Sequence, residues 1–297
     1  MKKTSSPPPI VFIVLLLLLL GGGWWYLKSP FSKPLLLSDN HVSSEEDSSN
    51  KAYSFQLPDA VPVGTNVRID GSTSMVNINE KLKKGFEDKY PGTKVVTNAH
   101  SSERGIQDLI AGNIDVAAVS RHLTDNDEKK GLQAVIISND AIAIVVHKID
   151  NPFQGGLTGT QIADIFQGKI TNWSQVGGSS DPIRVINRPV ESGTRQTFKK
   201  LVLGNADFGT ASNFITLRRD TTTGLIRELK KNGIGYATYK QAAKESTARI
   251  VAIDNSVPGA SNYAYQRKLL YVYKKPPNPA VKAFLGYATS KQVKEAL

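Results

Sequence analysis

Two segments far apart in the chain place small hydroxyl-bearing residues between a strand-like run and an amphipathic helix. In the first, Ser72, Thr73 and Ser74 follow the apolar run that begins at Val67. The start of a helix carries unpaired backbone N–H groups and a partial positive charge. Small residues let an anion approach that backbone, and hydroxyl groups add further donors.

The second segment lies more than a hundred residues later and has the same design. Arg188 ends a strand-like run, and Ser192, Gly193 and Thr194 then open a helix with Phe198 on its apolar side. Serine and threonine are also ordinary N-cap residues, so one such segment would be weak evidence for a site. Two of them facing each other would form a clamp for a small oxyanion.

The composition limits the classes of function. Hydrophobic residues make up 40% of the 297 residues and charged residues 21%, which is typical of a globular protein. The net charge of +11 fits either a plain basic surface or attraction to anions. No recognition helix, aromatic RNA-binding signature or zinc-finger spacing is present, so we expect no nucleic-acid partner. The absence of cysteine excludes disulfides, thiol catalysis and cysteine metal sites, and we expect no cofactor.

The N-terminal segment predicts export. Lys2 and Lys3 precede an uncharged stretch over residues 5–27, which is long enough to span a membrane and ends in aromatic residues including Trp24. Because no clear cleavage site follows, residues 10–27 are expected to remain as an inner-membrane anchor, with a cleaved signal as the alternative. Residues 28–62 are rich in Ser, Pro and acidic residues and are predicted to form a flexible linker.

From residue 63 onward, strand-like and helix-like patterns alternate, which predicts an α/β fold with a mixed sheet. The expected strands are residues 67–70, 93–98, 114–120, 134–138, 141–147, 183–187, 234–238, 250–253 and 269–273. The expected helices are residues 75–90, 105–111, a helix capped by Thr160, and residues 194–203, 223–231, 280–287 and 291–297.

Five motifs in a fixed order resemble one known family. They are Asp70-Gly-Ser-Thr-Ser-Met75, the pair Ser101-Ser102, the segment from Ile114 to Arg121, the segment from Asp164 to Trp173, and Arg188 followed by Glu191-Ser-Gly-Thr-Arg195. In these segments the chain resembles the phosphate-binding proteins of bacterial phosphate ABC transporters.

The resemblance implies a type II periplasmic-binding-protein fold, in which two α/β lobes joined by crossover strands close over an anion. Lobe one would comprise residues 66–146 and 239–297, and lobe two residues 151–236. Residues 141–147 and 233–239 would be the hinges. The implied phosphate-binding residues are Ser72, Thr73, Ser74, Ser102, Ser120, Arg121, Asp140, Arg188, Ser192, Gly193 and Thr194.

One departure from the family affects how protonated phosphate would be recognised. Many relatives have an aspartate after the strand that ends near Ser120, whereas this chain has Arg121. Asp140 is therefore our candidate acceptor for the proton of phosphate, with Arg121 keeping its carboxylate ionised. Glu103 would weaken anion binding unless it faces solvent or pairs with Arg104.

The expected function is that of an extracytoplasmic solute-binding protein on the periplasmic side of the bacterial inner membrane. It would capture inorganic phosphate and deliver it to an ABC transporter permease, without enzymatic activity. A membrane-tethered anion sensor is an alternative. A phosphatase that uses Ser192 or Thr73 is another, although the sequence has no nucleophile elbow and no histidine or metal cluster that would activate a hydroxyl.

Overall fold

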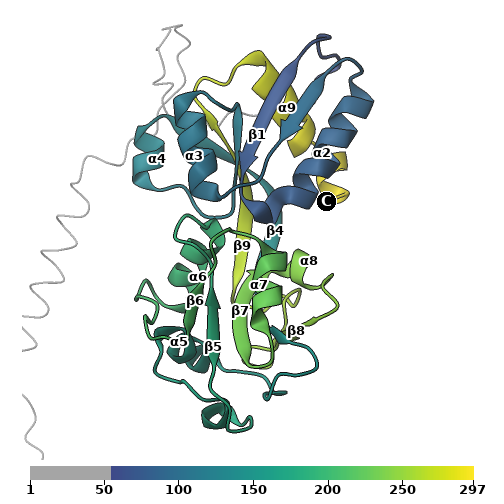
Figure 1. The fold of residues 1–297 in the computed structure, drawn as a ribbon. Coiled ribbons are helices and arrows are strands. Elements are labelled where there is room, and N and C mark those ends of the chain that lie inside the picture. The colour runs from purple at the N-terminus through teal and green to yellow at the C-terminus, as the bar shows by residue number, and fades with distance from the viewer. Residues whose placement is uncertain (1–54) are drawn as a thin grey trace, which may run out of the picture. The chain divides into compact units, whose positions relative to one another are not determined.

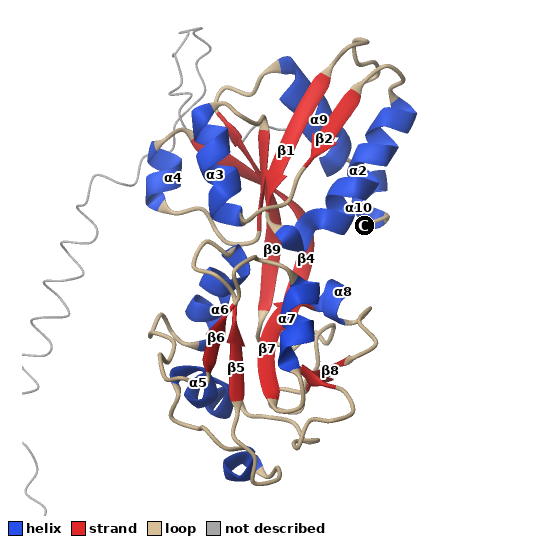
Figure 2. Cartoon of the chain, viewed as in Figure 1, coloured by secondary structure: helices blue, strands red, loops and turns tan. Residues whose placement is uncertain are grey.

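The computed structural model describes residues 55–297, which form one α/β unit built on a mixed sheet (Figures 1 and 2). The strand order is β2-β1-β3-β9-β4-β7-β5-β6, and β8 pairs with β4 beside this path. The strands are β1 (Asn66–Gly71), β2 (Lys94–Thr97), β3 (Val116–Val119), β4 (Leu132–His147), β5 (Arg184–Asn187), β6 (Phe214–Thr216), β7 (Gly233–Thr238), β8 (Ala248–Val251) and β9 (Gln266–Lys274). The α/β fold class is therefore confirmed.

The first lobe surrounds the parallel strands β2, β1 and β3. Its helices are α2 (Val76–Lys89), α3 (Ser102–Ala111), α4 (Asp125–Lys129), α9 (Pro279–Thr289) and α10 (Lys291–Glu295). Phe86 of α2 packs edge-on against Phe284 of α9, with ring centroids 5.3 Å apart. This core holds the end of β1, and hence the 3-10 turn η1 (Thr73–Met75), in a fixed position.

The second lobe surrounds β7, β5 and β6, which are also parallel. Its helical elements are α5 (Gly159–Gln167), η2 (Trp173–Val176), α6 (Gly193–Val202), α7 (Thr222–Leu229) and α8 (Tyr239–Ala242). Phe198 of α6 stacks on Tyr236 of β7 at 4.0 Å, which fixes the start of α6 against the sheet. The helix expected to be capped by Thr160 is instead capped by Thr158, whose side chain accepts a hydrogen bond from the N–H of Gln161.

A ribbon of two antiparallel strands, β4 and β9, connects the lobes (Figure 1). β4 is one continuous strand of 16 residues, not the two separate strands expected, because pairing with β9 continues through a register shift between Ile136 and Ser138. Within this ribbon Asp140 lies directly opposite Arg267. Residues 142–146 of β4 then pair with β7 inside the second lobe.

The ribbon changes the expected division of the chain. β7, expected as a hinge, pairs on both sides within the second lobe, and the second crossing strand is β9. The segment between β7 and β9 was expected in the first lobe. It belongs to the second lobe instead, because four of its side chains pack in the apolar core of that lobe: Val251, Ile253, Tyr263 and Tyr265. The chain therefore returns to the first lobe at about residue 266, not 239.

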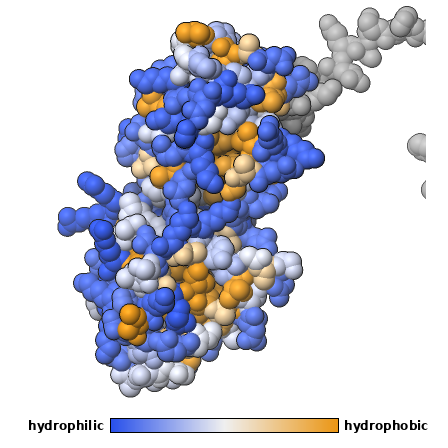
Figure 3. All heavy atoms as spheres, turned by 90° about the vertical axis from the view of Figure 1, so that its right-hand side faces the viewer, coloured by the Kyte–Doolittle hydropathy of each residue, from blue (hydrophilic) through white to orange (hydrophobic). Residues whose placement is uncertain are grey.

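Between residues 55 and 297, no helix combines the length and apolarity needed to cross a membrane. The face shown in Figure 3 is mostly hydrophilic, with apolar residues in separate patches. The predicted anchor, residues 10–27, and most of the predicted linker lie outside the described residues.

Candidate functional site

Three serines of the first lobe meet where β1, β3 and α3 come together. Ser72 follows β1, Ser120 follows β3, and Ser102 is the first residue of α3. Ser72 Oγ donates to Ser120 Oγ at 2.8 Å, and Ser102 Oγ lies 3.2 Å from Ser120 Oγ. All three side chains are buried. Ser101, not Ser102, caps α3 by accepting from the N–H of Arg104, so the Ser102 hydroxyl is not used as a helix cap.

The start of α6 in the second lobe packs directly on this group. A Cβ at Gly193 would lie 2.2 Å from Ser102 Oγ and 2.7 Å from Ser120 Oγ, which is too close for any side chain. Ser192 caps α6 through the N–H of Arg195, and Thr194 Oγ1 lies 3.0 Å from Ser74 Oγ of the first lobe. We call Ser72, Ser74, Ser102, Ser120 and Thr194 the hydroxyl cluster. Its members come from both lobes.

Arg267 supplies a positive charge to the hydroxyl cluster, and sequence analysis did not find it. Its Nη1 donates to Thr194 Oγ1 at 2.8 Å, and its Nη2 donates to Ser74 Oγ at 3.2 Å and to Thr238 Oγ1 at 2.5 Å. The side chain is 2% exposed. Burial lowers the pKa of Arg267, and the nearby carboxylate of Asp140 opposes that shift.

Two buried side-chain oxygens of the candidate binding residues have no hydrogen-bond partner within residues 55–297. Asp140 Oδ2 accepts from Nε and Nη2 of Arg267, both at 2.8 Å, whereas Asp140 Oδ1 is buried and unpaired. Thr73 Oγ1 is also buried and unpaired. Buried polar atoms are normally hydrogen-bonded, so unpaired ones are candidates for contact with a ligand.

Arg188 is the second buried cation. It donates to Asp220 through Nη1 and to Thr222 Oγ1 at 2.8 Å through Nη2. The charges of Arg188 and Asp220 both act on Arg267, so the two arginines share one electrostatic environment. Arg195, the last residue of the fifth motif, donates to the backbone oxygen of Arg188 at 2.5 Å and lies over the ring of Phe208, so it positions the loop.

Arg121 does not belong to this group, which corrects the expectation that it would act on Asp140. Its Nε donates to Glu103 at 2.6 Å, and its Nη1 donates to Asp127 at 2.7 Å and to the carbonyl oxygen of His122. Burial lowers the pKa of Arg121, but its hydrogen bonds to both carboxylates and their negative charges outweigh this effect and raise the pKa overall. Arg267 is the cation that pairs with Asp140. Glu103 is paired with Arg121, and not with Arg104 as considered above.

The remaining acidic and imidazole groups do not form a metal centre within residues 55–297. His100 pairs with Asp70 at 2.7 Å between the Nδ1 and Oδ2 atoms. Ser192 Oγ accepts from a backbone N–H and has no general base among its recorded partners in the described part of the chain. The arrangement offers hydroxyl donors, two arginines and two helix starts, which together suit a small oxyanion.

A signal in the sequence could have revealed Arg267. Along β9, Gln266 and Lys268 are exposed, whereas Arg267 is buried like Leu269 and Tyr271, which share its face of the strand. A charged residue in phase with buried apolar positions must find a partner inside the protein. Asp220, Thr222 and Thr238 carry no comparable signal, because Asp220 lies in the loop before α7 and the two threonines lie at the ends of elements, where polar residues are common.

The family model described as the PBP superfamily domain matches residues 58–292. The chain belongs to the PBP superfamily. Among its relatives in the superfamily, the phosphate-binding protein PstS of Bacillus subtilis (strain 168) is 26% identical over 237 residues, which cover 77% of each chain. PstS of Borreliella burgdorferi is 28% identical over 242 residues, which cover 75% of this chain and 84% of the relative.

Solved structures of superfamily members agree. A substrate-binding protein from Clostridium perfringens, solved with bound phosphate, is 30% identical with a TM-score of 0.69, and the match covers 77% of this chain and 95% of that one. An ABC-type phosphate transport receptor from Vibrio cholerae is 26% identical with a TM-score of 0.63, covering 77% and 96%. The resemblance to phosphate-binding proteins that the five motifs indicate is therefore confirmed.

Proposed function

We propose that this chain captures inorganic phosphate between its lobes and delivers it to an ABC transporter permease. The observation that carries the proposal is the hydroxyl cluster, whose members come from both lobes and two of which, Ser74 and Thr194, accept from the buried guanidinium of Arg267. A dianion held there would receive hydrogen bonds from both lobes at once. The matched relatives named for phosphate binding and transport support the same ligand.

The binding set combines neutral donors with charges that nearly balance. Arg188 is paired with Asp220 and Arg267 with Asp140, so each cation adds donors while its partner carboxylate limits the local excess of positive charge. Hydrogen bonds in which one partner is ionised are shorter and stronger than neutral ones. The proposed set is Ser72, Thr73, Ser74, Ser102, Ser120, Asp140, Arg188, Ser192, Gly193, Thr194 and Arg267.

Asp140 gives the set one acceptor. Phosphate near neutral pH still carries a proton, whereas sulfate does not. The unpaired Oδ1 of Asp140 would accept that proton's hydrogen bond, but it would face sulfate with an unpaired lone pair. A mismatch of this kind in a buried site can discriminate strongly between similar ligands.

Two alternative functions are weaker. A phosphatase needs an activated nucleophile, and the relatives are named as binding proteins and receptors, not as enzymes. A tethered anion sensor would use the same site, and deletion of the chain distinguishes it from a transport component, because phosphate uptake would then stay unchanged. We place the folded domain outside the cytoplasm, held to the membrane by residues 10–27. A mature protein whose N-terminal sequence begins near residue 28 would refute that anchor.

Calorimetric titration of the full chain with phosphate, sulfate and molybdate tests the proposal. The double variant Ser192→Ala/Thr194→Ala should bind phosphate about 100-fold or more weakly, because each hydrogen bond to a charged group contributes about 1.5–3 kcal/mol. A matched control, Thr210→Ala/Ser212→Ala, removes two exposed hydroxyls of the same lobe and should bind normally. Unchanged affinity in the first variant would rule out this site.

A further inference from the structure

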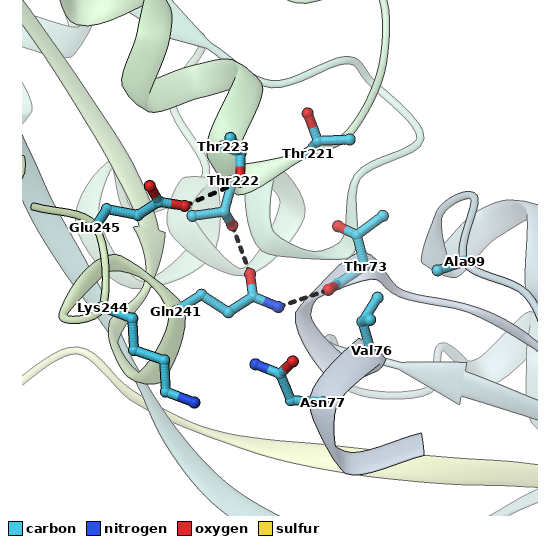
Figure 4. Close-up of a pocket in the computed structure, with 10 residues that line it drawn as sticks. All are labelled: Thr73, Val76, Asn77, Ala99, Thr221, Thr222, Thr223, Gln241, Lys244 and Glu245. Carbon is cyan, nitrogen blue, oxygen red and sulfur yellow. Dashed lines mark hydrogen bonds between the residues drawn. The ribbon is translucent and has the colours of Figure 1, made fainter. Parts of the chain in front are cut away.

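The side chain of Gln241 joins the two lobes beside the binding set (Figure 4). Gln241 lies in α8, directly after β7 of the second lobe. Its Nε2 donates to the backbone oxygen of Thr73 in the first lobe at 2.7 Å. Its Oε1 accepts from Thr222 Oγ1, at the start of α7 in the second lobe, also at 2.7 Å.

The chemistry of the partners allows only one direction for this chain of hydrogen bonds. A guanidinium can only donate, so Thr222 Oγ1 must accept from Arg188 Nη2 and has its single proton left for Gln241. A backbone carbonyl can only accept, so the amide nitrogen of Gln241 must face Thr73. The bonds therefore run from Arg188 through Thr222 and Gln241 to the turn that carries Thr73.

Gln241 itself stays outside the hydroxyl cluster. Its recorded hydrogen bonds go to Thr73 and Thr222, and it lines a hollow of about 370 Å³ that also contacts Asn77, Thr221 and Lys244. Figure 4 shows its amide between Thr222 and the backbone of Thr73, at the edge of this hollow. When the lobes separate, the bond to Thr222 can persist within the second lobe, whereas the amide nitrogen that faced Thr73 becomes solvated. The bond to Thr73 therefore favours the closed state without being indispensable to folding.

We infer that Gln241 is an interlobe latch that sets how long the closed protein retains its ligand. The inference rests on the proposed function, since it concerns the same site. A group that bonds both lobes only when they are closed shifts the equilibrium between open and closed forms. Because release requires opening, the latch acts on the dissociation rate, although it contacts no ligand atom. Thr222 bonds both Gln241 and Arg188, so the latch is connected through one hydroxyl to an arginine of the proposed binding set.

The decisive variant is Gln241→Leu, which keeps the size of the side chain and removes both hydrogen bonds. Dissociation of radiolabelled phosphate, chased with unlabelled phosphate, should be about 2- to 10-fold faster than in the wild type, because one interlobe hydrogen bond of ordinary strength, that to Thr73, is lost. The association rate should change less. Equal thermal unfolding temperatures of the variant and the wild type would show that the fold is intact.

A matched control uses Gln196, a second glutamine whose side chain makes a hydrogen bond between the lobes. Gln196 Nε2 donates to the Glu103 carboxylate at 3.1 Å, at the rim and without connection to a binding arginine. Gln196→Leu should change the dissociation rate by less than about twofold, since hydrogen bonds between such partly exposed side chains contribute little. If it accelerates release as much as Gln241→Leu, a specific latch at Gln241 is excluded.

A second pair of variants tests the link to Arg188. Thr222→Val removes the hydroxyl that connects Arg188 with Gln241, whereas Thr222→Ser restores it. Release should accelerate in Thr222→Val and return to within about twofold of the wild-type rate in Thr222→Ser, because serine supplies the same donor and acceptor. Equal rates in both variants would contradict the relay.

A measurement without ligand separates the latch from the ligand assignment. The chain has no cysteine, so Lys81→Cys and Lys231→Cys provide single spin-label sites on opposite lobes. In ligand-free protein, Gln241→Leu should shift the distance distribution toward longer separations. An unchanged distribution together with unchanged release would overturn the latch. Failure of the wild type to bind phosphate while the distribution still shifts would overturn the proposed ligand and leave the latch standing.

Discussion

Arg121 and Arg267 are both buried and both face carboxylates, but they differ in which parts of the chain satisfy them. The recorded partners of Arg121, which are Glu103, Asp127 and the His122 carbonyl, all belong to the first lobe. Arg267 has one carboxylate partner, Asp140, and its other donors reach hydroxyls of both lobes. Arg121 therefore bonds within one lobe, whereas Arg267 bonds hydroxyls of both lobes, as the phosphate site proposed above requires.

Replacing each arginine by lysine should separate these roles most strongly. Arg267→Lys keeps the charge but loses the planar fork, and phosphate affinity should fall about 100-fold or more, since at least two hydrogen bonds to a charged ligand are lost. Arg121→Lys should leave affinity within about threefold of the wild type. Titration calorimetry measures both. Equal losses of affinity in the two variants would show that the comparison is wrong.

The ion pair of Arg121 and Asp127 in the first lobe should instead affect stability in a pH-dependent way. Burial raises the pKa of Asp127, but hydrogen bonds from Arg121 and Thr124 outweigh this effect and hold it below its usual range. Because the folded pKa is depressed, the stabilisation is present above the ordinary Asp value of about 3.9 and disappears as the pH falls through the folded value.

Asp127→Asn should therefore cost about 2 kcal/mol in the free energy of unfolding near pH 7. The difference from the wild type should shrink in acid, where the wild-type carboxylate is also protonated. Urea denaturation at several pH values measures this difference. A cost that stays constant down to the lowest accessible pH would mean that the charge of Asp127 is not what stabilises the lobe.

The carboxylate beside Arg267 should affect selectivity. In Asp140→Asn, the preference for phosphate over sulfate should drop by about tenfold or more, because an acceptor for the phosphate proton is lost. Competition binding at constant pH measures the ratio of affinities. If the variant still rejects sulfate as the wild type does, or if the wild type binds both anions equally, Asp140 has no such role.

The same contrast shows what the sequence could and could not predict. Ser72, Thr73 and Thr194 could be proposed as binding residues from the sequence because hydroxyls at helix starts form a local pattern. The assignment of Arg121 was wrong because its adjacency to Ser120 along the chain does not determine where a long side chain points. Asp140 was assigned the wrong cation because its real partner lies 127 residues away on the neighbouring strand.

Fold prediction succeeded and failed for similar reasons. The alternation of apolar runs located most strands, because each run reports its own burial. The continuity of β4 was missed because residues 138–140 are polar, and their extended conformation depends on tertiary pairing with β9, which also buries Asp140 opposite Arg267. The extent of the second lobe was missed for the same reason, since Tyr263 and Tyr265 belong to its core only through packing between distant segments.

The register of the ribbon has a consequence for the sequence of events during capture. Asp140 and Arg267 are paired neighbours on adjacent strands, so their geometry is set by the ribbon and not by the distance between the lobes. The guanidinium is thus already aimed before closure, and an arriving anion has no reorientation of that group to induce. The anion would first bind Arg267 on the ribbon, and closure of the lobes would then bring their hydroxyl groups into contact with the bound ion.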